Sequence, residues 1–366
     1  MHCASLGEFE QGRPVLEAIK QQYPSSKIIL TFFSPSGYEI RKNYPGADAI
    51  FYLPMDSAAN ARKFIDTINP VLVLWVKYEY WYYYLSALEK RNIPVILISG
   101  IFRKDQPFFK WYGGLWRKML HFFSRFFVQN TYSESLLKQV GIPSEKIIVS
   151  GDTRFDRVVN IAEKKESIPG IDDFCGNSKV LIAGSTWEDD EAELVHYIRI
   201  HPEIKFVIAP HEVDPHNLKD VKKIFAGAVF YSELVNGDTL PAGTHILIID
   251  NIGILSKLYR YATVTYIGGG FGSDGIHNIL EAAVYGKPVI FGPVYEKFAE
   301  AVDCIAAGGA FSINNALELE RLLNSLFSDE SRLQQSGAAA GKYVHEHGGA
   351  TRTIMDHVKE NLLLTN

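Results

Sequence analysis

Short apolar, β-branched runs alternate with amphipathic helical patterns along most of the chain. A first group of runs covers residues 27–31, 49–52, 71–76, 95–99, 126–128 and 147–149, and a second covers residues 180–183, 206–209, 246–249, 264–267 and 288–291. Continuous apolar strands separated by helices are typical of parallel sheets that helices cover on both faces. The pattern therefore predicts an α/β protein built from doubly wound, Rossmann-like domains.

A polar, charged stretch at residues 160–177 separates the two groups of strands. We therefore expect an N-terminal domain over residues 1–152, a C-terminal domain over residues 153–350, and a terminal helix within residues 351–366 that packs back toward the N-terminal domain. A chain of 366 residues with 47% hydrophobic composition has enough apolar material for two cores. Since ligands bind beyond the carboxyl ends of parallel strands, we expect the ligand in a cleft between two facing domains.

The charge and the cysteine content argue against several classes of protein. A formal net charge of -5 argues against non-specific nucleic-acid binding, which requires a basic surface. The cysteines Cys3, Cys175 and Cys304 are scattered and lack metal-ligand spacing, so we expect neither a disulfide framework nor a zinc site. No apolar run approaches the roughly 20 residues that span a bilayer. These features fit a soluble or peripheral protein in a reducing cytoplasm.

A carboxylate is expected at the end of the first short strand. Gly7 and Glu8 follow that strand and precede a helix that the pattern starts near Gln11. Glycine permits a tight turn there, and Glu8 would project where a base deprotonates an incoming hydroxyl. The alternative is that Glu8 only complements the helix dipole. Glu79, which follows the strand ending at Val76, is expected at the same edge of the sheet.

A glycine-rich run, residues 268–272, follows a buried strand of the second group. We expect a helix over residues 277–285 behind it, with His277 and Asn278 at its positive end, where glycine N–H groups and the helix would bind a phosphate. Glu281 lies on the same helix face and is suited to accept hydrogen bonds from ribose hydroxyls. The alternative is a glycine-rich turn beside a helix-capping asparagine.

Three other strand ends carry polar residues. Ser185 and Thr186, followed by Glu188, form a capping arrangement that would leave N–H groups and hydroxyls for a phosphate; a plain capping box is the alternative. His211 offers a cation after another strand, although a lone histidine there is more often structural. Residues 36–38 follow a strand of the first group, with a plain turn as the alternative.

Residues 101–128 are basic and aromatic. The basic residues are Arg103, Lys104, Lys110, Arg117, Lys118 and Arg125, and the aromatic residues between them are Phe102, Phe108, Phe109, Trp111, Trp116, Phe122 and Phe123. Such a mixture suits the surface of an anionic membrane. A core helix with a solvated basic face is the equal alternative.

These motifs resemble, in order and spacing, those of the Kdo transferases of lipid A and lipopolysaccharide biosynthesis. That family moves 3-deoxy-D-manno-octulosonic acid (Kdo) from CMP-Kdo to a lipid A precursor. The matching stretches run nearly end to end, at residues 2–10, 36–39, 79–81, 184–186, 250–253, 268–269 with 275–281, and 286–289 with 291–293.

The resemblance implies a GT-B fold whose N-terminal domain binds the lipid acceptor and whose C-terminal domain binds the CMP-sugar donor. It implies an inverting reaction with no metal and no cofactor, in which Glu8 is the general base and Glu79 a second carboxylate that helps to hold the acceptor. The implied donor-binding residues are Ser185, Thr186, His211, Gly253, Gly269, Gly270, His277, Asn278 and Glu281. The residues on the acceptor side are Ser36, Gly37, Tyr38 and Arg103.

The chain departs from the family in three places. Residues 209–213 read Ala-Pro-His-Glu-Val instead of Ala-Pro-Arg-His-Pro, so His211 stands where an arginine is expected. The loop at residues 99–103 also differs from the family's acceptor-side loop. Members usually carry an N-terminal membrane anchor, whereas this chain starts within the first motif. We expect it at the cytoplasmic face of the inner membrane of a Gram-negative cell, bound through residues 101–128 or anchored by a segment absent here.

Two other functions stay open at this point. A UDP-sugar epimerase or hydrolase on the same fold would convert a UDP-sugar without an acceptor. A non-catalytic module would bind a nucleotide sugar at the membrane surface. The presence of both Glu8 and the set at residues 277, 278 and 281 favours the transferase, because a membrane binder alone would need neither.

Overall fold

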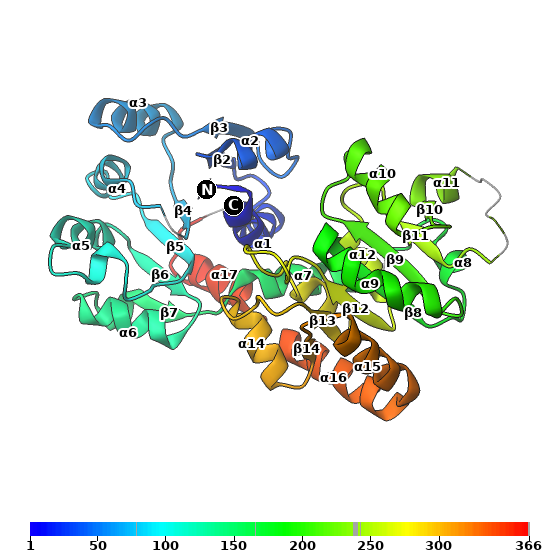
Figure 1. The fold of residues 1–366 in the computed structure, drawn as a ribbon. Coiled ribbons are helices and arrows are strands. Elements are labelled where there is room, and N and C mark those ends of the chain that lie inside the picture. The colour runs from blue at the N-terminus through cyan, green and yellow to red at the C-terminus, as the bar shows by residue number, and fades with distance from the viewer. Residues whose placement is uncertain (78, 165, 237–240, 242, 365–366) are drawn as a thin grey trace. The chain divides into compact units, whose positions relative to one another are not determined.

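The computed structural model describes residues 1–77, 79–164, 166–236, 241 and 243–364. The last two residues of the terminal segment 351–366, and residue 165 of the polar stretch 160–177, lie outside the described residues. The chain divides into two compact units (Figure 1). The first unit joins Met1–Arg157 with His347–Asn366, and the second is Val158–Glu346. The division at Arg157 falls within one helix, α7 (Thr153–Glu163).

The first unit is built on a seven-stranded parallel sheet of order β3-β2-β1-β4-β5-β6-β7. Its strands are β1 (His2–Cys3), β2 (Ile29–Phe32), β3 (Ala49–Tyr52), β4 (Val73–Val76), β5 (Val95–Gly100), β6 (Arg125–Val128) and β7 (Ile147–Val149). The two-residue strand β1 lies between β2 and β4, so the side chains that follow it emerge at the middle of the sheet.

Helices cover both faces of this sheet, as its continuous apolar strands require. Val95 and Leu97 of β5 pack into one core, whereas Ile96 and Ile98 pack into the other. The covering helices are α1 (Leu6–Gln22), α2 (Pro35–Arg41), α3 (Ala58–Ile68), α4 (Tyr82–Glu89), α5 (Gly114–His121), α6 (Thr131–Gln139) and α17 (Ala350–Glu360), with short 3-10 turns at Pro107–Phe109 and Ser144–Lys146.

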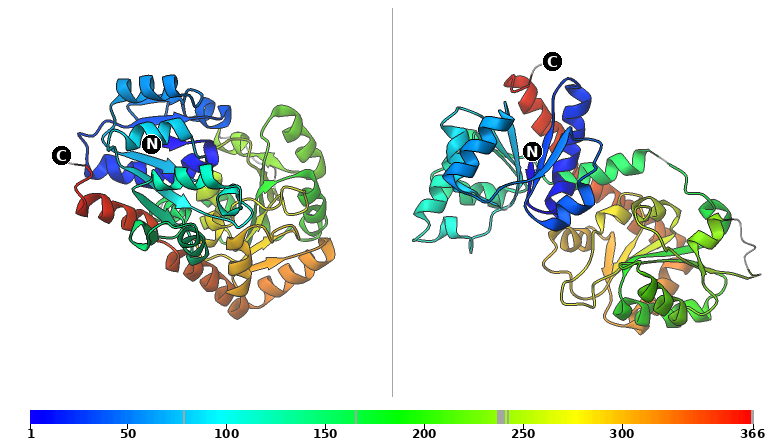
Figure 2. Two further views of the ribbon diagram at one scale, coloured as in Figure 1. Left: turned by 90° about the vertical axis from the view of Figure 1, so that its left-hand side faces the viewer. Right: turned by 90° about the horizontal axis from the view of Figure 1, so that it is seen from above.

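The terminal helix α17 lies beside α1 in the first unit (Figure 2). Its apolar residues Ile354, Met355 and Val358 are buried in the same core as Phe9 and Leu16 of α1. The N–H groups of Gly349 and Thr351, at its start, both donate to the Asp156 carboxylate. The end of the chain therefore completes the hydrophobic core of the unit in which the chain begins.

The second unit repeats the architecture with strand order β10-β11-β9-β8-β12-β13-β14, again parallel. The strands are β8 (Val180–Thr186), β9 (Lys205–Pro210), β10 (Val229–Phe230), β11 (Ile246–Ile248), β12 (Val264–Ile267), β13 (Val289–Phe291) and β14 (Ala310–Ser312). The helices are α8 (Ile171–Cys175), α9 (Glu188–Ile200), α10 (Pro215–Ile224), α11 (Tyr231–Val235), α12 (Leu255–Leu258), α13 (Leu280–Ala283), α14 (Ala299–Ala306), α15 (Ala316–Ser328) and α16 (Glu330–Glu346), with a 3-10 turn at Tyr259–Tyr261.

Every strand expected from the apolar runs forms, and the doubly wound α/β class is confirmed. Three shorter features differ from expectation. The edge strands β10 and β14 were not predicted, because two or three residues are too few for a recognisable pattern. Helix α1 begins at Leu6 instead of near Gln11. The helix predicted over residues 277–285 is reduced to the single turn of α13.

Candidate active site

Glu8 lies in the first turn of α1, directly beyond the carboxyl end of the central strand β1. The backbone N–H of Ser5 donates to Glu8 Oε2 at 2.9 Å, and the Ser5 hydroxyl donates to the same oxygen. The turn expected at Gly7 and Glu8 is therefore the start of the helix, and Glu8 forms its capping box. Both bonds use Oε2; among the described residues, no hydrogen bond reaches Oε1.

Glu79, beyond the end of β4, lies beside the buried histidine His2 of β1. His2 Nε2 is 3.6 Å from Glu79 Oε2, and His2 Nδ1 is 3.0 Å from the Thr31 hydroxyl. The Trp81 indole donates to Glu79 Oε2 at 3.1 Å, and the Trp75 indole donates to the Glu79 carbonyl at 2.5 Å. These bonds hold Glu79 in one orientation at the strand end.

The charges of both Glu79 and Glu8 affect the pKa of His2. Burial lowers the pKa of His2 below 6.5, whereas Glu79 and, more weakly, Glu8 raise it. His2 is 3% exposed, and its ring packs 4.6 Å from the Trp75 ring. The structure therefore brings Glu8 and Glu79 to the same part of the first unit, as predicted from their strand ends.

Residues 36–38, which were predicted to lie on the acceptor side, follow β2 and belong to α2, which contacts α1. The N–H groups of Phe33 and Ser34 donate to the Ala4 carbonyl, which ties this loop to the end of β1. Ser36 N–H donates to the Ser34 hydroxyl, which caps α2. Gly37 packs against the Phe32 ring, where a Cβ would lie 2.3 Å from a ring carbon. Tyr38 stacks on Tyr52, with ring centroids 4.1 Å apart.

Arg103 lies in the exposed loop after β5. Its backbone N–H donates to the Gln106 side chain at 3.0 Å. Within the described part of the chain, no hydrogen bond or ion pair connects Arg103 with Glu8, Glu79 or residues 36–38. The structure therefore places residues 36–38 in α2, which contacts the helix that carries Glu8, and the acceptor-side role of these residues and of Arg103 stays a prediction.

The basic, aromatic segment 101–128 divides into a buried part and an exposed tip. Phe102, Phe108, Phe122 and Phe123 are buried in the core, as the core-helix alternative expects. The exposed aromatic and aliphatic side chains are Trp111, Tyr112, Leu115 and Trp116, which we call the aromatic tip. Trp111 is 92% exposed, and Lys104 and Lys118 nearby in sequence are also exposed. The buried phenylalanines bear out the core alternative, and membrane binding through the exposed tip stays a prediction.

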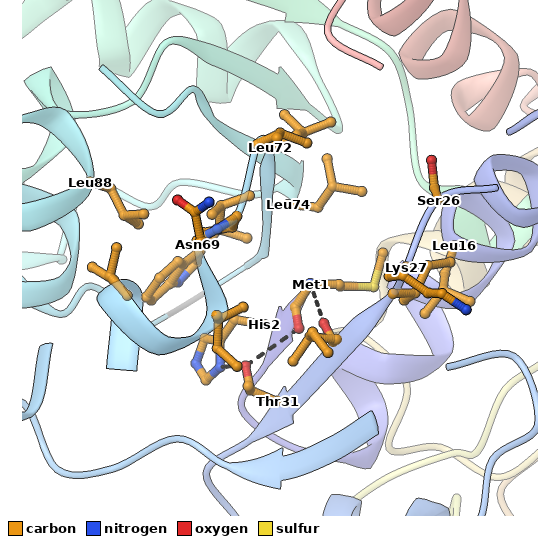
Figure 3. Close-up of a pocket in the computed structure, with 18 of the residues that line it drawn as sticks. Met1, His2, Leu16, Ser26, Lys27, Thr31, Asn69, Leu72, Leu74 and Leu88 are labelled. Carbon is orange, nitrogen blue, oxygen red and sulfur yellow. Dashed lines mark hydrogen bonds between the residues drawn. The ribbon is translucent and has the colours of Figure 1, made fainter. Parts of the chain in front are cut away.

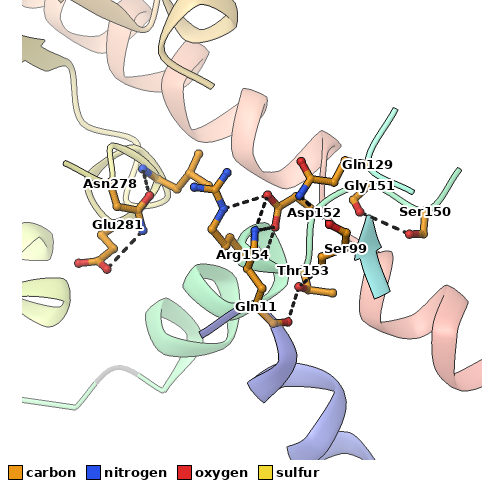
Figure 4. Close-up of polar contacts among 11 residues, drawn as sticks. Gln11, Ser99, Gln129, Ser150, Gly151, Asp152, Thr153, Arg154, Asn278 and Glu281 are labelled. Atoms are coloured by element: carbon orange, nitrogen blue, oxygen red, sulfur yellow. Dashed lines mark hydrogen bonds and ion pairs between the residues drawn. The ribbon is translucent and has the colours of Figure 1, made fainter. Parts of the chain in front are cut away.

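A buried polar network fixes α1 to the ends of the neighbouring strands (Figure 4). The Gln11 amide lies 3.3 Å from both Asp152 oxygens, and the Thr153 hydroxyl donates to the Gln11 carbonyl. The Ser99 hydroxyl is 2.8 Å from the Thr153 hydroxyl, and Arg154 donates to Asp152 through both its backbone and its Nε. These bonds hold the helix that carries Glu8 in place.

An apolar cavity of about 400 Å³ lies at the opposite, amino-terminal ends of β2 and β4 (Figure 3). Met1, Leu16, Leu72 and Leu74 are among the residues that line it. His2 and Trp75, which contact Glu79, also line this cavity. Ligands of parallel sheets bind at the carboxyl ends of the strands, so we place the candidate site on the Glu79 side of these two residues.

In the second unit, Ser185 and Thr186 end β8 and behave differently from each other. Ser185 is partly exposed and adopts a left-handed backbone with φ 55°. Thr186 is 1% exposed, and its hydroxyl donates to Glu191 at 2.8 Å. The expectation that the Thr186 hydroxyl is available for a phosphate is therefore wrong. The carboxylate that caps α9 is Asp190, not Glu188, since Asp190 accepts from the backbone N–H of Trp187.

Two carboxylates in the first turn of α9, Asp190 and Glu191, are buried next to the end of β8. Asp190 accepts from the Tyr266 hydroxyl at 2.7 Å and from the Gly269 N–H at 2.8 Å. Burial raises the pKa of Asp190 above its ordinary value and raises the pKa of Glu191 to about 7. Asp190 thus joins the start of α9 to the glycine-rich loop after β12.

The glycines of that loop serve close backbone packing. A Cβ on Gly268 would lie 2.2 Å from the Ser185 carbonyl oxygen, and one on Gly270 would lie 2.5 Å from the Gly292 nitrogen. Gly269, with φ 90°, gives its N–H to Asp190. All three glycines are buried. The expectation that the Gly269 N–H binds a phosphate is therefore wrong, because the protein's own carboxylate occupies it.

Three aromatic rings meet at the ends of β8, β9 and β12. The indole N–H of Trp187 donates to His277 Nε2 at 3.1 Å, and the two rings are nearly coplanar, 14° apart. The His211 ring stacks on both, with centroids 4.5 Å from Trp187 and 4.4 Å from His277. His211 and His277, predicted separately, thus lie in one cluster. Burial and the adjacent His211 lower the pKa of His277 to about 4.

Asn278 and Glu281, which were predicted to share a helix face, contact each other. The Asn278 amide is 3.3 Å from Glu281 Oε1, and Asn278 Oδ1 accepts from the Leu280 N–H (Figure 4). Asn278 is therefore a capping residue, as the alternative interpretation expects, but α13 behind it has only four residues. A helix this short supplies little dipole, and phosphate binding at its start stays a prediction. Gly253, with φ 99°, lies in the exposed loop after β11.

The described residues contain neither a metal cluster nor a membrane-spanning helix. No group of three or more His, Cys, Asp or Glu side chains is placed to hold a metal ion. None of the described helices combines the length and the apolar character needed to cross a bilayer.

Sequence reasoning did not select His2, Trp81, Trp187, Asp190 or Glu191 as site residues. Ser5 and Glu8 have the S-x-x-E spacing of a capping box, a signal that places the start of α1 correctly. The cluster of Trp187 and His277 had no comparable signal, because the two residues are 90 positions apart.

The first part of the chain matches the family model described as 3-deoxy-D-manno-octulosonic-acid transferase (kdotransferase), over residues 1–157. A 3-deoxy-D-manno-octulosonic acid transferase of Haemophilus influenzae is 25% identical, and the alignment covers 99% of this chain and 86% of that protein. The Aquifex aeolicus enzyme of the same name is also 25% identical, over 91% of this chain and 87% of that enzyme.

A further relative is longer than this chain. The bifunctional glycosyltransferase/methyltransferase of Fusobacterium nucleatum is 25% identical over all of this chain, which spans 57% of that protein. The similarity to the Kdo transferases expected from the motifs is therefore confirmed across nearly the full chain.

Solved structures confirm the GT-B class of the fold. The UDP-GlcNAc 2-epimerase of Neisseria meningitidis, bound to UDP-GlcNAc, has a TM-score of 0.67 at 17% identity, covering 98% of each chain. A putative UDP-N-acetylglucosamine 2-epimerase of Listeria monocytogenes has a TM-score of 0.66 at 14% identity, covering 100% of this chain and 96% of that one. At such identities the likeness concerns the fold alone.

Proposed function

We propose that this chain, a glycosyltransferase related to the Kdo transferases, moves Kdo from CMP-Kdo to a hydroxyl of a lipid A precursor. The observation that carries the proposal is the half-buried Glu8 carboxylate at the end of the central strand β1, with Glu79 held nearby. The family model that matches residues 1–157 supports the sugar, and the names of the relatives support the reaction class.

Glu8 acts as the general base in this proposal. Its Oε2 is engaged by Ser5, whereas Oε1 accepts the proton of the acceptor hydroxyl as that hydroxyl oxygen attacks the anomeric carbon of Kdo. The bond from that carbon to the CMP phosphate oxygen breaks, and its electron pair leaves with CMP. Attack from the face opposite the leaving group inverts the anomeric carbon. Glu79, fixed by Trp81 and Trp75, helps to orient the acceptor.

The second unit binds the donor. Asn278 and Glu281 are suited to the ribose hydroxyls, and the Gly253 loop is suited to lie against the base. Ser185 is partly exposed at the end of β8, and His211 and His277 supply ring N–H groups. A single phosphate is a good leaving group that hydrogen-bond donors can stabilise, so the proposed reaction needs neither a metal nor a cofactor.

We further propose that the aromatic tip binds the cytoplasmic face of the inner membrane, where the lipid acceptor resides. Trp111, Tyr112, Leu115 and Trp116 expose apolar area without a partner in the described structure, and basic side chains flank them. Tryptophan and tyrosine favour the membrane interface, and lysine and arginine favour anionic lipids.

Release of CMP distinguishes the proposed reaction from its alternatives. A transferase releases CMP from CMP-Kdo only when a tetraacylated lipid A precursor is present. A UDP-sugar hydrolase would instead release UDP from a UDP-sugar, and an epimerase would convert UDP-GlcNAc, both without an acceptor. A non-catalytic module would do none of these. Lipid-dependent release of CMP supports the proposal, and any of the other three results contradicts it.

A further inference from the structure

The Trp187–His211–His277 cluster determines where a proton sits. An indole N–H can only donate a hydrogen bond, so His277 Nε2, 3.1 Å away, must be the acceptor. A neutral imidazole carries one proton, and with Nε2 as acceptor that proton lies on Nδ1. A protonated ring would carry an N–H on Nε2 as well, directed at the indole N–H. The hydrogen bond from Trp187 therefore opposes both the other tautomer and the cation.

The surroundings of His277 also disfavour its protonated, positively charged form. His211 stacks 4.4 Å away, so a positive charge on either ring disfavours one on the other. Burial and this neighbour lower the pKa of His277 to about 4. The nearby carboxylates have partners of their own: Asp190 accepts from Trp187, Gly269 and Tyr266, and Glu281 accepts from Asn278.

The backbone fixes both members of the pair. Trp187 is held by the bond from its N–H to Asp190, and His277 by the bond from its N–H to the Gly268 carbonyl at 3.1 Å. His211 covers the two rings together, and its own N–H donates to the Thr186 carbonyl. The cluster is thus built from the ends of three neighbouring strands and does not depend on one flexible side chain.

We propose that Trp187 is a positioning residue that holds His277 as the neutral Nδ1–H tautomer, so that His277 offers one ring N–H to an oxyanion of the donor. The part that concerns the ligand rests on the proposed function. The oxyanion is the nucleotide phosphate or the sugar carboxylate, which share the same hydrogen-bond acceptor chemistry.

Trp187→Phe tests the tautomer in the protein without ligand. Phenylalanine keeps an aromatic ring for His211 to stack on but cannot donate a hydrogen bond. The ¹⁵N chemical shifts of the His277 ring, assigned by comparison with His277→Gln, distinguish the two tautomers and the cation. We expect Nδ1–H alone in the wild type at pH 7, and a mixture that includes Nε2–H in Trp187→Phe. Nε2–H or the cation in the wild type, or no change in the variant, would overturn the proposal.

Calorimetric binding of CMP and of free Kdo tests the role toward the ligand. If His277 contacts the phosphate, Trp187→Phe should weaken the affinity for CMP; if it contacts the sugar carboxylate, the affinity for Kdo should weaken. We expect about a tenfold loss for one impaired hydrogen bond. Tyr132→Phe, at an exposed aromatic position of α6 in the first unit, is the control and should bind both as the wild type does. Unchanged affinity for both ligands in Trp187→Phe would contradict the ligand role. Failure of the wild type to bind either ligand would instead contradict the proposed function, and the tautomer result then decides the inference alone.

Discussion

Glu8 shows how one carboxylate can have a structural and a chemical role at once. Helix capping and base catalysis were alternative interpretations of this residue in the sequence. In the structure, the two Ser5 donors both contact Oε2, and no described group donates to Oε1. Capping therefore fixes the side chain and leaves one oxygen for a substrate hydroxyl, so the two interpretations are compatible.

Glu8→Gln separates the two roles. Glutamine keeps a carbonyl oxygen for the cap but loses the basicity, so we expect the turnover rate to fall by about 10²- to 10⁴-fold while CMP affinity stays unchanged. Glu17→Gln, on the same helix and paired with Arg13 at the surface, is the control and should retain full turnover. Near-normal turnover of Glu8→Gln would rule out Glu8 as the base.

Glu191 makes the stability of the second unit depend on pH. Burial raises its pKa from 4.5 to about 7, so the folded state favours the protonated form. The stabilisation is complete below about pH 4.5 and is lost as the pH rises through about 7. We expect Glu191→Gln, which can still accept from Thr186, to exceed the wild type at pH 8 by on the order of 1–3 kcal/mol of unfolding free energy and to equal it near pH 4.5.

Urea denaturation at the two pH values measures this difference. Glu330→Gln, exposed at the start of α16 in the second unit, is the control and should leave the pH dependence of the wild type unchanged. If Glu191→Gln showed the same pH dependence as the wild type, the buried carboxylate would not be its source.

At the scale of elements, the glycine-rich loop after β12 was predicted in the right place for the wrong reason. Its glycines were expected to bring N–H groups to a phosphate. They instead let the loop pack against the backbone at Ser185 and Gly292, and Asp190 takes the Gly269 N–H. What a sequence cannot reveal is which backbone will pass close to a glycine, because that backbone comes from a different strand.

Gly270→Ala tests this packing role. Its Cβ would lie 2.5 Å from the Gly292 nitrogen, and backbone cannot move aside as a flexible side chain can. We expect a loss of at least about 2–3 kcal/mol in unfolding free energy, measured by urea denaturation. Gly272→Ala in the same loop is the matched control, since its Cβ would meet only the Gly269 carbonyl oxygen at an ordinary 3.6 Å. Equal stability of the two variants would contradict the packing argument.

Other elements show which sequence patterns were sufficient to predict a strand or a helix. Long apolar runs, such as those that became β5 and β8, predicted buried parallel strands correctly because burial on both faces demands continuous apolar residues. The pattern at residues 277–285 suggested a helix, but the His277 N–H bonds to the Gly268 carbonyl, and Gly286 adopts φ 66°. Only the turn at Leu280–Ala283 remains helical between these two constraints.

At the scale of the whole molecule, the average composition does not reveal that the aromatic tip is an exposed apolar surface. The net charge of -5 gives no hint of membrane binding, yet the aromatic tip exposes four large apolar side chains beside basic residues. Only the structure separates this tip from the buried phenylalanines of the same segment, because all of them look alike in the sequence.

Replacing Trp111 and Trp116 together by alanine tests the membrane role. We expect co-sedimentation with phosphatidylglycerol vesicles to fall at least about tenfold, because two interfacial indole rings are lost. Leu317→Ala, an exposed apolar residue of α15 in the second unit, is the control and should bind as the wild type does. Vesicle binding that survives the double substitution would place the membrane contact elsewhere.

The most direct test of the central claim is the mass spectrum of the lipid after the protein acts on CMP-Kdo and a tetraacylated lipid A precursor. We expect the precursor to gain the mass of one or more Kdo residues, and the size of the mass increase counts the sugars added. A lipid of unchanged mass, in the presence of folded protein that binds CMP, would contradict it.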